Sequence, residues 1–117
     1  MRVKLVDTIA KEGLSLFPDH FHIDAKEQDP HGIVVRSSTI DVSNYDSLLA
    51  VARAGSGVNN ITIDEATRRG ICVFNAPGAN ANAVAELVMI MAGMGARKIY
   101  RGITFCKGLA GLADQDV

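Results

Sequence analysis

Short runs of apolar, mostly β-branched residues recur along the chain, and helical patterns lie between several of them. Such runs are typical of buried strands, and their alternation with helices is typical of an α/β fold with a parallel sheet. We expect strands at residues 3–6, 21–23, 33–35, 48–52 and 71–74. The sequence therefore predicts an α/β fold in which polar loops follow the carboxyl ends of neighbouring strands.

Two short helices are expected among these strands. Asp7 or Thr8 can cap a short helix that runs through about Leu16. Thr62 and Glu65 fit a capping box, in which the threonine hydroxyl bonds an amide of the first helical turn and the glutamate reaches back. Gly70 suits the left-handed end of this second helix.

A long apolar helix is expected near the end of the chain, from Asn82 as its N-cap to about Lys98, with a second helical stretch over 100–109. Its apolar residues lie on every side, and a helix of this kind is normally buried. Its longest apolar run, 87–96, is too short to cross a bilayer, which needs about 20 residues. We therefore expect helix 82–98 to be covered by another copy of the chain, in a homo-oligomer.

The charge balance excludes several classes of partner. The net charge of the 117 residues is −1, so no basic field exists that would bind nucleic acid or an anionic membrane. Cys72 and Cys106 match no metal-ligand spacing and indicate a reducing, cytoplasmic location. The three histidines follow none of the expected strands, and solvated or core positions suit them better than a catalytic role.

Three polar loops follow expected strands, at residues 36–39, 53–60 and 75–80. Ligands of open parallel sheets bind beyond the carboxyl ends of the strands, so these loops are expected to form one site. Arg36 could bind a carboxylate or phosphate through two parallel N–H bonds, or it could be a surface residue paired with a nearby aspartate, Asp41 or Asp46.

The glycines of the middle loop also have two readings. Gly55 and Gly57 permit close approach of the backbone, so their loop could cradle an anion, or it could be only a tight exit from the strand. A dinucleotide fingerprint is rejected here, because Asn60 replaces its third glycine and Asn75 stands where an acidic residue should hold the ribose.

Five segments, taken together and in this order, carry a family resemblance. They are Val34-Val-Arg-Ser-Ser-Thr39, Ala52-Arg-Ala-Gly-Ser-Gly-Val-Asn-Asn-Ile61, Ala66-Thr-Arg-Arg-Gly-Ile71, Asn75-Ala-Pro-Gly-Ala-Asn80 and Val84-Ala-Glu-Leu87. The series resembles the D-isomer-specific 2-hydroxyacid dehydrogenases, and most closely the D-3-phosphoglycerate dehydrogenases among them. The resemblance covers about residues 33–98.

This resemblance implies a flavodoxin-like substrate-binding domain over residues 1–76 and, over 77–117, the crossover and first helices of a Rossmann domain. It implies that Arg36 and Ser37 hold the phosphate or carboxylate end of the substrate, and that Asn80 lines the cleft. It further implies that the middle loop receives the carboxylate of a 2-hydroxy acid, through Arg53, Ala54, Gly55, Ser56 and Gly57.

The implied activity is the NAD-dependent oxidation of 3-phosphoglycerate to 3-phosphohydroxypyruvate in serine biosynthesis. The family's catalytic residues and the loop that binds most of the NAD would lie beyond Val117, so this chain alone is expected to be inactive, with no metal site. The alternatives are a related dehydrogenase for glycerate or lactate, and a non-catalytic module that binds small anions or is only structural. A receiver-like module is disfavoured, because Asp7 stands alone after the first strand and Arg36 follows the third.

Overall fold

The computed structural model describes residues 1–110, and the chain forms two compact units, Met1–Ala79 and Asn80–Val117. The functional division expected at residues 76 and 77 stays a prediction, and positions 111–117 of its second part lie outside the described residues.

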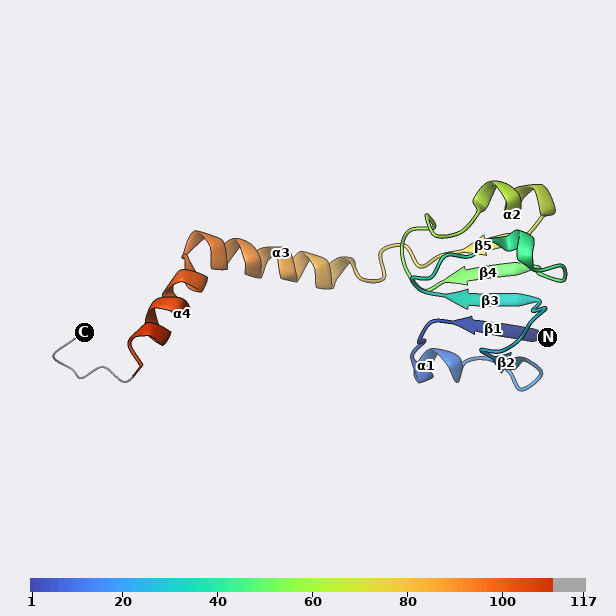
Figure 1. Ribbon diagram of the computed structural model, residues 1–117, viewed down its shortest axis with the longest axis horizontal. Helices are drawn as coiled ribbons and strands as arrows, with labels where there is room; N and C mark the ends of the chain where they lie inside the picture. Colours follow the sequence, from blue (N-terminus) through green and yellow to red (C-terminus); the bar gives the residue numbers. More distant parts are fainter. Residues whose placement is uncertain (111–117) are drawn as a thin grey trace. The chain divides into compact units, whose positions relative to one another are not determined.

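The first unit is built on a five-stranded sheet in the order β2-β1-β3-β4-β5, and every neighbouring pair is parallel. This is the strand order of flavodoxin-like folds, so the predicted fold class is confirmed. The arrows of Figure 1 point the same way, and the loops that follow the strands therefore share one edge of the sheet, which we call the carboxyl edge. The strands are β1 (Arg2–Val6), β2 (His22–Asp24), β3 (Gly32–Val35), β4 (Ala50–Arg53) and β5 (Cys72–Phe74).

The hydrophobic core lies against one face of this sheet. Ile33 of β3 pairs with Val51 of β4, which pairs with Val73 of β5, so the three side chains line the same face. The chain between β3 and β5 covers them with the short helices η1 (Val42–Asn44) and α2 (Ile63–Arg69). The buried cluster is Ile33, Val35, Ile40, Val42, Leu48, Val51, Ile61, Ala66 and Ile71.

The end of α2 follows the sequence prediction, but its start does not. Gly70 has a left-handed φ of 69°, and its amide donates to the carbonyl of Thr67, as expected for a glycine that ends a helix. The capping box is wrong, because the Thr62 hydroxyl accepts a hydrogen bond from the Val42 amide at 3.1 Å instead. Glu65 pairs with Arg68 on the same helix.

The first helix is shorter than predicted. α1 (Lys11–Leu14) forms a single turn with Ala10 at its N-cap position, whereas the sequence predicted a helix through about Leu16 capped by Asp7 or Thr8. Asp7 instead has a positive φ of 81°, and its carboxylate bonds the loop that follows β3. A partner 29 residues away in the sequence has taken the oxygen atoms that a helix cap would need.

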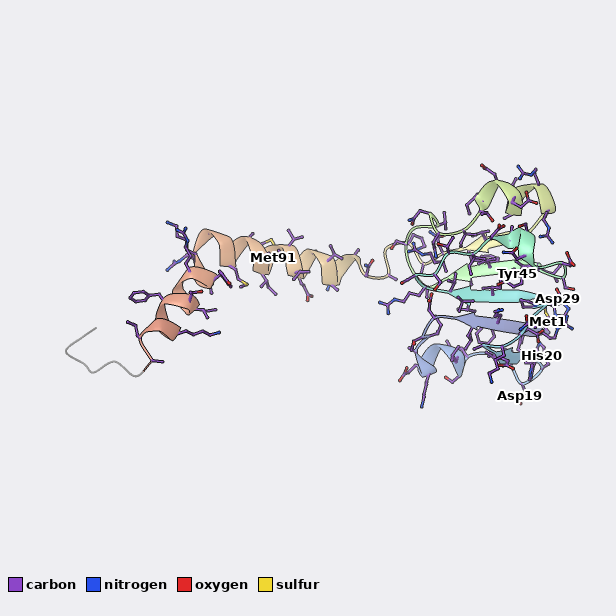
Figure 2. The ribbon with its side chains drawn as sticks, in the orientation of Figure 1. Met1, Asp19, His20, Asp29, Tyr45 and Met91 are labelled. Atoms are coloured by element: carbon purple, nitrogen blue, oxygen red, sulfur yellow. The ribbon has the colours of Figure 1, made fainter. Side chains whose placement is uncertain are left out.

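The second unit contains α3 (Ala81–Ala96) and α4 (Ile99–Gly108), separated at Lys98 by a left-handed φ of 50°. The predicted N-cap is wrong by two positions: Asn80 stands at the N-cap position of α3 without a capping side-chain bond, and the side chain of Asn82 donates to Glu86 one turn later, at 2.7 Å. No residue of α3 is buried, and Met91, labelled in Figure 2, is 61% exposed. Within residues 1–110, no helix is long and apolar enough to cross a membrane.

Candidate functional site

The sheet has a topological switch point between β1 and β3. The chain leaves β1 toward β2 on one side and leaves β3 toward β4 on the other, so the two exits diverge at the carboxyl edge. Ligands of flavodoxin-like sheets bind at this position. Asp7 follows β1 and Arg36 follows β3, so both residues lie at the switch point.

The Asp7 carboxylate is engaged by the loop after β3. Its Oδ2 accepts the backbone amides of Arg36, Ser37 and Ser38 at 2.9, 2.7 and 3.0 Å, and its Oδ1 accepts the Ser38 hydroxyl. The Ser38 hydroxyl, followed by these amides, holds the pKa of Asp7 well below its ordinary value, because each hydrogen bond favours the charged form. Asp7 is therefore a fixed negative charge beside Arg36.

The guanidinium of Arg36 is exposed and available. Among the described residues, no ion pair or hydrogen bond engages it, so the alternative of a pairing with Asp41 or Asp46 does not occur there. Arg36 lines an open pocket of about 330 Å³ at the switch point. The rest of the lining comes from the start of the β1–β2 connection and from the end of β4, namely Thr8, Ile9, Ala10, Gly13 and Ala54.

Arg53, at the end of β4, ties the first two loops together. Its Nε donates to the carbonyl oxygen of Arg36 at 3.1 Å. Its guanidinium also lies over the glycine loop, because a Cβ on Gly57 would stand 2.9 Å from Arg53 Nη1. A Cβ on Gly55 would stand 3.5 Å from Arg53 Cζ, which is an ordinary contact. Arg53 is thus a brace between the loops, a role that the sequence did not indicate.

The third loop joins the same assembly. The side-chain amide of Asn75 donates to the carbonyl of Ser56 at 2.6 Å, and the amide of Ala76 donates to the carbonyl of Gly55 at 2.9 Å. The structure therefore brings together seven of the eight residues expected in the site, although their role in binding stays a prediction. They are Arg36, Ser37, Arg53, Ala54, Gly55, Ser56 and Gly57. The eighth, Asn80, belongs to the second unit, and its place in a cleft stays a prediction.

The glycine loop does not fit a dinucleotide. Asn60, at the position of the third glycine, is buried, and its side-chain amide donates to the carbonyl of Ser38 at 2.7 Å. β5 ends at Phe74, and Asn75, which follows it, carries no charge and is used to hold Ser56. These two asparagines connect loops within the first unit, so we assign no NAD-binding step to the residues described.

The remaining polar groups do not add a catalytic centre at this edge. His20 and His22 are exposed, and His31 precedes β3, where its Nδ1 accepts the amide of Arg2 at 3.1 Å. Figure 2 shows His20 near Met1 and Asp29, at the edge where the strands begin. Over residues 1–110, no three His, Cys, Asp or Glu side chains gather where they could hold a metal ion.

Sequence reasoning missed two residues of this edge, Asp7 and Asn60. Each forms hydrogen bonds to backbone atoms of the loop after β3, and these partners lie more than 20 residues away in the sequence. A signal for Asp7 existed, because it directly follows the strand that forms one side of the switch point. No local pattern distinguishes Asn60 from a polar residue of an exposed loop.

Comparison with known proteins agrees with this fold. Human D-3-phosphoglycerate dehydrogenase is 47% identical over 73 residues, which cover 57% of this chain and 14% of the human protein. Hydroxypyruvate reductase of Thermotoga maritima is 40% identical over 79 residues, covering 64% of this chain and 26% of that protein. The chain thus spans well under half of the relatives it matches.

A solved structure gives the same result at the level of coordinates. The NAD⁺-bound 3-phosphoglycerate dehydrogenase of Entamoeba histolytica superposes with a TM-score of 0.69 at 27% identity, over 84% of this chain and 40% of that one. The sequence model of the D-isomer specific 2-hydroxyacid dehydrogenase catalytic domain matches residues 6–111, which is most of the chain. The chain therefore belongs to the D-isomer specific 2-hydroxyacid dehydrogenase family.

Proposed function

We propose that the first unit is the substrate-binding part of an NAD-dependent D-3-phosphoglycerate dehydrogenase, which oxidises 3-phosphoglycerate to 3-phosphohydroxypyruvate in the cytoplasm. The observation that carries the proposal is the joining of three strand-end loops at the carboxyl edge of the sheet, where the exposed guanidinium of Arg36 lines a pocket. The human relative named for this activity supports the choice of substrate. NAD would be held by a part of the protein other than the residues described.

In this proposal the substrate's two acidic groups have separate receptors. Arg36 and Ser37 receive the phosphate or carboxylate end, since a guanidinium can give two parallel N–H bonds to either group. The loop from Arg53 to Gly57 receives the other end through backbone amides, and its open backbone at Gly57 permits close approach. Asn80 would line the cleft near the start of α3.

The proposal is tested by calorimetric or NMR titration of the chain with 3-phosphoglycerate. Arg36→Ala removes a charged hydrogen-bond donor worth about 1.5–3 kcal/mol, so we expect the Kd to rise about 10- to 150-fold. Arg68→Ala is the matched control, because Arg68 pairs with Glu65 on α2 and carries the same charge. Equal affinities for the unmodified chain and Arg36→Ala would contradict the assignment.

A second candidate is a dehydrogenase that acts on glycerate or another 2-hydroxy acid without a phosphate. The similarity to a hydroxypyruvate reductase favours it, and the loops described here would serve either substrate. Titration with D-glycerate separates the two, because only a phosphate-specific site loses affinity when the phosphate is removed. A chain that binds neither acid would be a structural module.

We propose also that the exposed apolar surface of α3 is covered by a second copy of the chain. Leu87, Val88 and Met91 are each more than half exposed, although they are large apolar side chains. Contiguous exposed apolar surface of this kind marks an interaction site. The isolated chain is expected to be a homo-oligomer without dehydrogenase activity.

A further inference from the structure

The backbone conformation of Asp7 is unusual for a residue with a side chain. Its φ of 81° places it in the region that favours glycine, directly after β1. Such a conformation persists when the surrounding structure over-determines it, and it is found most often at functional sites. At Asp7 the determining contacts are the hydrogen bonds that its carboxylate accepts from the loop after β3.

These hydrogen bonds fill a ready-made anion site. The amides of three consecutive residues, Arg36, Ser37 and Ser38, converge on one oxygen of Asp7. Convergent backbone amides of this kind form a nest, which binds anionic groups. Because the chain's own carboxylate occupies this nest, a substrate anion is left with the side chains of Arg36 and Ser37 and not with these amides.

The peptide backbone of Arg36 is also held from both sides. Asp7 accepts its amide at 2.9 Å, and Arg53 donates to its carbonyl at 3.1 Å. A side chain on a fixed backbone loses less freedom when it binds a ligand, so the affinity of the site depends on this clamp. Arg53 alone would leave the amide end of the clamp open.

We propose that Asp7 is a positioning residue for anion recognition: it fixes the backbone of Arg36, and it keeps the nest closed to the ligand. The ligand is directed to the Arg36 guanidinium over the pocket. This inference rests on the proposed function, in which Arg36 receives an acidic group of the substrate. Asp7 itself does not touch the ligand.

The test compares Asp7→Gly and Asp7→Asn with the unmodified 117-residue chain, using 3-phosphoglycerate as the probe. Glycine accepts the positive φ and removes the carboxylate, whereas asparagine keeps one acceptor oxygen and loses the charge. We expect the Kd of the glycine variant to rise about tenfold or more, with asparagine in between.

Asp29→Asn is the matched control. Asp29 also accepts a serine amide and hydroxyl, both from Ser47, but it lies at the edge where the strands begin (Figure 2). The control is expected to bind the probe within about twofold of the unmodified chain, since it lies outside the clamp. If Asp29→Asn bound 3-phosphoglycerate as weakly as Asp7→Gly, the proposal would be overturned, because the loss of affinity would then reflect a general loss of stability.

Chemical rescue gives a readout that needs no probe. In Asp7→Gly, formate should re-occupy the nest and return the amide resonances of Arg36, Ser37 and Ser38 toward their unmodified positions. If Asp7→Gly does not fold, the affinity of Asp7→Asn decides. This inference alone is overturned if the Asp7 variants bind 3-phosphoglycerate as tightly as the unmodified chain does. It is also overturned if formate leaves the amide resonances of Asp7→Gly unchanged. If the unmodified chain does not bind 3-phosphoglycerate, the proposed function is overturned as well.

Discussion

Replacing Gly57 with alanine tests the packing of Arg53 over the glycine loop. The new Cβ would stand 2.9 Å from Arg53 Nη1 and 3.2 Å from Asn59 Oδ1, and both distances are shorter than ordinary contacts. Alanine can adopt the backbone conformation of this position, because Gly57 does not have a left-handed φ. The arginine head is flexible, so we expect it to move aside and give up its hydrogen bond to the carbonyl of Arg36.

Gly55→Ala is the matched control, since its Cβ would meet Arg53 at 3.5 Å, an ordinary contact. A glycine-to-alanine change without strain stabilises by about 0.4–1 kcal/mol through the unfolded chain. At Gly57 the lost charged hydrogen bond, about 1.5 kcal/mol, outweighs that gain. The free energy of unfolding of Gly57→Ala is therefore expected to lie about 1–2 kcal/mol below that of Gly55→Ala.

The assay is urea unfolding followed by far-UV circular dichroism, together with titration of 3-phosphoglycerate. We expect Gly57→Ala to weaken binding about tenfold, because the displaced Arg53 no longer holds Arg36. If Gly57→Ala were as stable as Gly55→Ala and bound as tightly, the reasoning from Arg53 would be refuted.

Two further predictions concern acid stability and self-association. Serine hydrogen bonds lower the pKa of Asp7, Asp29 and Asp41, so these groups contribute stability that is present above the unfolded pKa of 3.8 and is lost as the pH falls below it. The urea concentration at the midpoint of unfolding should stay constant from pH 7 to about pH 5 and should decrease once the pH falls below about 4. An increase of the midpoint on acidification would contradict the predicted direction of the pH dependence. Leu87→Lys with Met91→Lys, on one face of α3, should turn a dimer into a monomer in sedimentation at micromolar concentration, whereas an unmodified chain that is already monomeric would argue against association through α3.

The sequence was sufficient for the parts of the fold that local chemistry decides. Apolar runs predicted β1, β3, β4 and β5, because side chains such as Ile33, Val35 and Val51 suit a buried, extended segment, and the alternation at 21–23 predicted β2. Gly70 predicted the end of α2, since a left-handed residue is required there. Parallel strands then place the loops that follow them at one edge, and the meeting of Arg36 with Arg53 follows from that topology.

Two of the predictions that were wrong share one cause, which is a competing partner far along the chain. Thr62 fits the sequence pattern of a capping box, but its hydroxyl accepts a hydrogen bond from the Val42 amide. Asp7 fits the sequence pattern of a helix cap, but its carboxylate accepts hydrogen bonds from the loop after β3. Capping patterns describe neighbours in sequence, so they carry no information about such tertiary partners.

The most direct test of the site is to map where 3-phosphoglycerate binds, by following the backbone amides of the ¹⁵N-labelled chain during titration. The account predicts that Arg36, Ser37 and the amides of Gly55–Gly57 shift together with a single Kd, because the three loops form one receptor. Shifts confined to the opposite edge, around Asp29 and Ser47, or the absence of shifts at Arg36, would contradict it.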